Sequence, residues 1–81
     1  MKQLCTTLQT EFGDGVICTI SPHSESIHII PGHDETFFTG VQMTKIVKYC
    51  NGHNLGFFFE CDNGRIVVYY SEVSKFTSNH L

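Results

Sequence analysis

The side chains of this chain best suited to binding a metal belong to its five histidines and four cysteines. Structural zinc sites usually draw their ligands from close pairs along the sequence. Cys50 and His53 form such a pair, because the first closes an expected helix and the second lies in the following loop. His28 falls in the middle of an expected strand, whereas His23 and His33 fall in the loops at its ends. Because this scatters the histidines, we expect no metal and no other cofactor, with Cys50 and His53 as the alternative metal site.

Nucleophilic catalysis is the second chemistry to consider, and Cys50 with His53 is again the nearest pairing of a thiol with a base. A reactive thiolate needs a partly exposed, electropositive position. All four cysteines instead fall on core-facing positions, and Cys50 lies near the carboxyl end of a helix, where the dipole disfavours an anion. The chain also lacks a glycine-rich phosphate loop, a nucleophile elbow and a dinucleotide fingerprint. The sequence predicts no catalytic residue and no enzymatic activity.

The charge of the chain argues against nucleic acid as a partner. Five Lys and Arg residues stand against eight Asp and Glu residues, a formal net charge of −3. Nucleic-acid affinity comes mainly from neutralising phosphates, and so few scattered cations supply little of it. No stretch has the length and apolarity of a membrane span, and none resembles a secretion signal. We therefore expect a cytoplasmic protein with reduced cysteines, no membrane association and no nucleic-acid partner.

The first half of the chain has the pattern of a helix followed by a hairpin. Residues 2–12 place their apolar side chains on one helical stripe, and glycines follow directly. That stripe consists of Leu4, Cys5, Leu8 and Phe12. Residues 16–20 and 27–30 are rich in β-branched side chains, which favours two strands, and the polar segment 21–26 separates them as a turn.

The second half begins with the clearest helix signal of the chain. Thr39 and Gln42 have the spacing of a capping box, in which each side chain bonds the backbone of the other residue. This predicts a helix over residues 40–51, with Gly52 just beyond its end as the left-handed cap.

A second hairpin follows this helix. Residues 55–61 and 65–70 are mostly apolar and flank an Asn-Gly pair at positions 63 and 64. Asn-Gly is the strongest short signal for a two-residue hairpin turn. In that register Phe58 faces Tyr69 across the strands.

Both halves have the same order of elements, which predicts an α+β fold of two helix–hairpin units, αββαββ. We expect a four-stranded, mostly antiparallel sheet with both helices on one face. The length suits one domain, placed at residues 1–72, followed by a polar, flexible tail at 73–81. The expected core comprises Leu4, Leu8, Phe12, Val16, Cys18, Ile20, Ile27, Ile29, Met43, Ile46, Val47, Cys50, Phe57, Phe59, Ile66, Val68 and Tyr70.

The other face of the sheet is the candidate interaction surface. Two helices can cover only one face, so apolar side chains on the other face lie open or meet a partner. The candidate residues are Phe58, Val67, Tyr69, Ile17, His28 and Ile30. In one alternative, the tail around Val73 and Phe76 covers this face. In another, its aromatic residues stack on single-stranded RNA, which the lack of a basic groove disfavours.

The composition supports the interaction hypothesis. Only 16% of the residues are charged, against about 25% in a typical domain, so part of the surface is apolar. We expect a small non-enzymatic interaction module, a regulator or inhibitor that docks on a protein partner or forms a homodimer. The alternative function is a small-ligand or metal-binding domain that uses the histidines.

Overall fold

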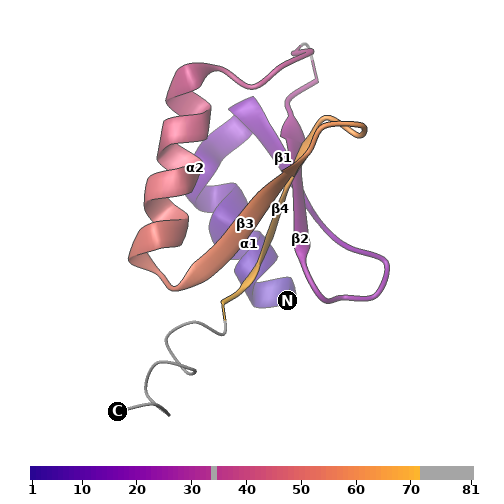
Figure 1. Cartoon of the computed structure of the whole chain (residues 1–81), viewed down its shortest axis with the longest axis vertical. Helices are drawn as coiled ribbons and strands as arrows, with labels where there is room; N and C mark the ends of the chain where they lie inside the picture. The colour runs from indigo at the N-terminus through magenta and orange to yellow at the C-terminus, as the bar shows by residue number, and fades with distance from the viewer. Residues whose placement is uncertain (34, 72–81) are drawn as a thin grey trace.

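The computed structural model describes residues 1–33 and 35–71. Its elements follow in the order α1, a 3-10 turn, β1, β2, α2, β3 and β4 (Figure 1). The helices are α1 (Lys2–Phe12) and α2 (Gly40–Gly52), and the 3-10 turn covers Gly13–Gly15. The strands are β1 (Val16–Ile20), β2 (Ile27–Pro31), β3 (Leu55–Glu60) and β4 (Arg65–Tyr70). The tail predicted over residues 73–81 lies outside the described residues.

The four strands form one antiparallel sheet in the order β1-β2-β4-β3. Strands β2 and β4 join the two hairpins at its centre, which leaves β1 and β3 at the edges. The α+β class and the four-stranded antiparallel sheet expected from the sequence are confirmed. Within the described residues, no helix is both long enough and apolar enough to span a membrane.

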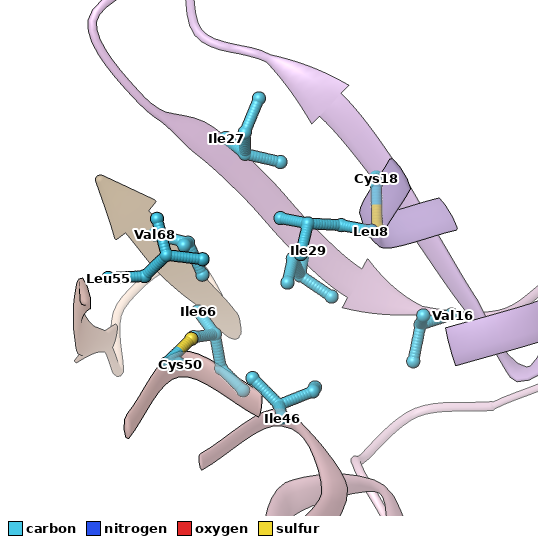
Figure 2. Close-up of a cluster of buried hydrophobic side chains, with 10 residues drawn as sticks. All are labelled: Leu8, Val16, Cys18, Ile27, Ile29, Ile46, Cys50, Leu55, Ile66 and Val68. Carbon is cyan, nitrogen blue, oxygen red and sulfur yellow. The ribbon is translucent and has the colours of Figure 1, made fainter. Parts of the chain in front are cut away.

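One cluster of buried side chains joins the helices to the sheet (Figure 2). Leu8 of α1 and Ile46 and Cys50 of α2 are fully shielded from solvent there. Burial of one large aliphatic side chain contributes roughly 1.5–3 kcal/mol to stability. The strands contribute alternate residues: Val16, Cys18, Ile27, Ile29, Leu55, Ile66 and Val68. The side chains between these point to the other face of the sheet, away from the cluster.

Three residues predicted in the core are exposed, namely Ile20, Phe59 and Tyr70. Ile20 and Tyr70 are the last residues of their strands, beyond the middle of the sheet where burial is greatest. Phe59 is 43% exposed because β3 is an edge strand of the described sheet. Cys61, also predicted on a core face, lies exposed in the turn after β3. The alternation of side chains along a strand predicts which face of the sheet a residue occupies. It does not predict how far the helices extend over that face.

The start of α2 matches the capping box predicted from the sequence. The Thr39 hydroxyl accepts a hydrogen bond from the Gln42 N–H at 3.1 Å, and the Gln42 Oε1 accepts one from the Thr39 N–H at 2.9 Å. The Gln42 Nε2 also donates to the Gly15 carbonyl oxygen at 3.0 Å. The same side chain thus caps α2 and ties it to the 3-10 turn.

The end of α2 differs from the prediction. Gly52 belongs to the helix, His53 caps it, and Asn54 adopts the left-handed conformation with φ 56°. The His53 ring stacks on Tyr49 with centroids 3.9 Å apart, and its Nδ1 lies 2.8 Å from the Tyr49 carbonyl oxygen. The imidazole satisfies a carbonyl of the last turn, so the glycine cap is not needed.

Strands β3 and β4 pair in a register two residues away from the predicted one. Glu60 faces Arg65, which gives a four-residue loop in place of the two-residue Asn-Gly turn. Phe58 therefore faces Val67 rather than Tyr69. The side chains of Glu60 and Arg65 form an ion pair that closes this longer loop. A shift by two residues leaves every side chain on its predicted face, so the face assignment is unaffected.

Gln9 of α1 covers the outer edge of β1, a contact that the sequence analysis did not predict. Its Nε2 donates to the carbonyl oxygens of Gly13 and Val16, both at 2.9 Å. Its Oε1 accepts from the Cys18 N–H at 2.8 Å. One amide side chain thus uses both its donor protons and its acceptor. The outward carbonyl of Val16 and the outward N–H of Cys18 are thus paired without a further strand.

We expect Gln9→Ala to lower the free energy of unfolding by about 1–3 kcal/mol, because half-buried backbone groups of β1 lose their partners. Urea unfolding followed by circular dichroism measures this change. Gln3 is exposed on the same helix, so Gln3→Ala is the matched control and should stay within about 0.5 kcal/mol of wild type. Equal losses in the two variants would show that the Gln9 contacts contribute nothing.

Candidate docking face

The candidate interaction residues all belong to the face of the sheet that points away from the buried cluster. One row crosses three strands, where His28 lies beside Val67 and Val67 lies beside Phe58. Ile17 and Ile30 face each other in a neighbouring row. The name docking face is used below for this set: Ile17, His28, Ile30, Phe58, Val67 and Tyr69.

Two aromatic rings form much of the exposed part of the docking face. Phe58 is 46% exposed and Tyr69 37%, and their ring centroids lie 6.0 Å apart in a tilted arrangement. A pair of this kind contributes about 0.5–1.5 kcal/mol beyond the area that it buries. The Tyr69 ring lies against Gly56, its partner across the strands, where a Cβ atom would overlap the ring. Glycine at this position therefore allows the tyrosine ring to settle onto β3.

Val67 is the one buried member of the docking face. It lies on the docking face but is only 5% exposed, because His28 and Phe58 flank it on the neighbouring strands. It supports the rings instead of offering contact area itself. Ile30 is exposed, while Ile17 and His28 are half-buried.

A charged pair lies at the hairpin end of the same face. Arg65 donates from Nε to the Glu60 carboxylate, which also accepts a hydrogen bond from Asn63 Nδ2 at 3.2 Å. The hydrogen bond from Arg65 is the main cause that lowers the pKa of Glu60. A lowered carboxylate pKa means that the pair stabilises the hairpin at neutral pH and loses this effect as the pH falls through that pKa. The docking face thus has an apolar centre and a polar rim.

Cys50 and His53, the alternative metal ligands, occupy different environments. The Cys50 thiol lies in the buried cluster (Figure 2), whereas His53 is exposed and bonded to the backbone of its own helix. Across residues 1–33 and 35–71, no three His, Cys, Asp or Glu side chains come together as a metal site would require. The described geometry therefore gives the metal-binding alternative no support.

Burial also shapes the chemistry of the thiols. Removal from water raises the pKa of Cys50 to about 11. Burial, and then the nearby Cys5, raise the pKa of Cys18 to about 12. Both side chains therefore stay protonated at neutral pH and are poor nucleophiles.

We expect a thiol reagent to modify Cys61 of the native protein quickly and to leave Cys18 and Cys50 unmodified until the chain unfolds. Cys61 is exposed in the β3–β4 loop, whereas the other two are buried. Labelling with and without denaturant, with mass spectrometry to assign the sites, measures the difference. Cys61→Ser is the control that should remove the fast phase. Rapid native modification of Cys50 would contradict its burial.

A shallow groove between α2 and β3 was not predicted from the sequence. It is lined by Met43, Thr44, Val47, Lys48 and Phe59. An adjoining hollow on α2 shares Thr44 and Lys48 and adds Gly40, Val41 and Lys45. The name α2–β3 groove is used below for this joint surface. The sequence predicts Met43 and Val47 in the core, but both side chains are half-buried and lie at its margin. Their position there depends on β3 being an edge strand, which the strand order shows.

In comparisons with known proteins, the chain matches no protein-family model, no curated protein and no solved structure. Inference about its function therefore rests on the geometry of the docking face and of the α2–β3 groove.

Proposed function

We propose that this chain is a small non-enzymatic interaction module, a regulator or inhibitor, that docks through the docking face onto a protein partner or a second copy of itself. One observation carries the proposal: Phe58 and Tyr69 form an exposed ring pair on the face turned away from the core. Large aromatic side chains at the centre of a patch, surrounded by a polar rim, are typical of binding hot spots.

The exposure of this face follows from the arrangement of the helices. We infer two helix–hairpin units in the order αββαββ, with both helices on one face of the sheet. In support, Leu8 of α1 and Ile46 of α2 share a single buried cluster with alternate residues of all four strands. The described residues supply no third layer, so nothing within residues 1–33 and 35–71 covers the docking face.

The rings are also held in place before any partner arrives. Tyr69 rests on Gly56, and Phe58 is supported by Val67, which is buried beneath the surface. Side chains that are already ordered lose little conformational entropy on binding. The apolar area that they then remove from water is worth about 25 cal/mol per Å².

Protein is a better match than nucleic acid for this face. Arg65, the cation at the rim, already pairs with Glu60 and is not available to a phosphate without breaking that pair. A cytoplasmic setting is part of the proposal, supported by the four free cysteines.

The experiment that tests the proposal substitutes Phe58 with aspartate and measures association. Light scattering after size exclusion reports self-association, and affinity capture from native lysate reports other protein partners. Association that disappears in Phe58→Asp supports the proposal, and association of the same strength in both proteins contradicts it.

A further inference from the structure

The outer edge of β3 carries backbone groups that point away from the sheet. The Ser71 N–H donates to the Asn54 carbonyl oxygen at 3.1 Å, so these two residues form a hydrogen-bonded pair at the start of the β3–β4 ladder. In an antiparallel ladder, hydrogen-bonded pairs alternate with pairs whose backbone groups point away from the partner strand. The backbone groups of Leu55, Phe57 and Phe59 therefore face outward, and no other strand of residues 1–33 and 35–71 pairs with them.

The opposite edge of the sheet is partly covered. At β1 the same alternation turns Val16 and Cys18 outward, and the Gln9 side chain bonds the carbonyl of the first and the N–H of the second. Edge strands are templates for pairing with another chain unless they are covered in this way. Among the hydrogen bonds of the described residues, β3 has no counterpart of Gln9. Within residues 1–33 and 35–71 the two edges therefore differ, and the uncovered one is β3.

The open edge adjoins the α2–β3 groove, whose lining shows what would fit there. Met43, Val47 and Phe59 make the groove apolar beside the strand, and Lys48 lines it on the helix. Lys45 lines only the adjoining hollow on α2. The residues that line this groove include no Asp or Glu. Glu60 and Asp62 line a separate hollow that also includes Phe59. An occupant with carboxylates toward the helix and apolar side chains toward the strand matches this pattern.

We propose that β3 accepts an extended acidic and apolar peptide segment of a partner protein as an additional strand of the sheet. The peptide backbone pairs with Leu55, Phe57 and Phe59, its apolar side chains enter the α2–β3 groove, and its carboxylates meet Lys45 and Lys48. A second copy is disfavoured as the occupant, because symmetric pairing of two β3 strands would bring the lysines of both α2 helices to the same side of the new sheet. This surface is separate from the docking face.

The test uses two short synthetic peptides on the full chain, one of repeating Val-Val-Glu-Glu and one of repeating Val-Val-Lys-Lys. Either side of such a strand carries both residue types, so the result does not depend on the register. We expect the glutamate peptide to bind more tightly by roughly fivefold to tenfold at low salt, with the preference shrinking as salt is added. The double variant Lys45→Glu with Lys48→Glu should reverse the preference.

Hydrogen exchange locates the binding. The amides of Leu55, Phe57 and Phe59 should become protected when the glutamate peptide binds, whereas those of Gly56 and Phe58 already pair with β4 and should change little. Phe58→Asp should bind the peptide like wild type, which separates this proposal from the docking face. Absence of binding, equal binding of both peptides, or protection elsewhere overturns the proposal. Protection that rises with protein concentration alone would assign the edge to a second copy and also overturn it.

Discussion

Ile46→Ala should lower the free energy of unfolding by about 2–5 kcal/mol, the usual range for truncating a large aliphatic side chain in a packed core. Ile46 has no exposed surface and lies where α2 meets Leu8 and the sheet (Figure 2). Its truncation removes apolar contacts and leaves a cavity among residues of both helices. A domain of this size has little stability in reserve, so the variant should be partly unfolded at body temperature.

Val41 provides the matched control on the same helix. It is 79% exposed, so Val41→Ala removes almost no buried area, and alanine favours the helix more than valine does. Its stability should lie within about 0.5 kcal/mol of wild type. Urea unfolding of the three proteins tests the pair. Similar losses for both variants would mean that α2 does not pack as described, and the inferred openness of the docking face would lose its basis.

Phe58→Asp should weaken association by at least 2 kcal/mol, about thirtyfold, because it places a carboxylate in the exposed ring pair of the docking face. The fold should survive, since Phe58 is 46% exposed and its ring lies outside the buried cluster. We expect a stability loss of no more than about 1 kcal/mol, from the poor strand preference of aspartate.

Phe37 offers a control for the general effect of replacing an exposed aromatic residue with a charge. It is 78% exposed and lies in the segment between β2 and α2, outside the strands of the sheet. Phe37→Asp should therefore leave association unchanged. If it weakens association as much as Phe58→Asp does, the change in net charge and not the docking face is responsible.

Much of the fold could be predicted from local patterns. The capping box of Thr39 and Gln42 uses only residues within one helical turn, so its geometry is readable from their spacing. The face of each strand residue depends on a period of two, which survives even a register error of two residues. For this reason the residues of the docking face are predicted on one face even though the predicted length of the β3–β4 loop is wrong.

What could not be predicted depends on contacts between distant segments. The burial of Val67 requires the order of the central strands, and the exposure of Phe59 requires the knowledge that β3 is an edge. The hydrogen bonds of Gln9 depend on where α1 meets β1. In the sequence, Gln9 is one polar residue among several on a helix surface, so its pattern does not predict these contacts. The function is harder still, since an exposed apolar face does not identify the molecule that would cover it.

The most direct test of the docking face compares two substitutions on one strand. Phe58 and Phe59 are neighbours in β3 with exposures of 46% and 43%, but their side chains point to opposite faces of the sheet. The measurement is the dissociation constant of the association for wild type, Phe58→Asp and Phe59→Asp. The association measured is with a second copy, or with a captured partner that also binds the Lys45→Glu, Lys48→Glu variant and so does not depend on the α2–β3 groove. The proposal predicts that Phe58→Asp loses association and that Phe59→Asp retains it. Equal loss in both, or loss in Phe59→Asp alone, would contradict it.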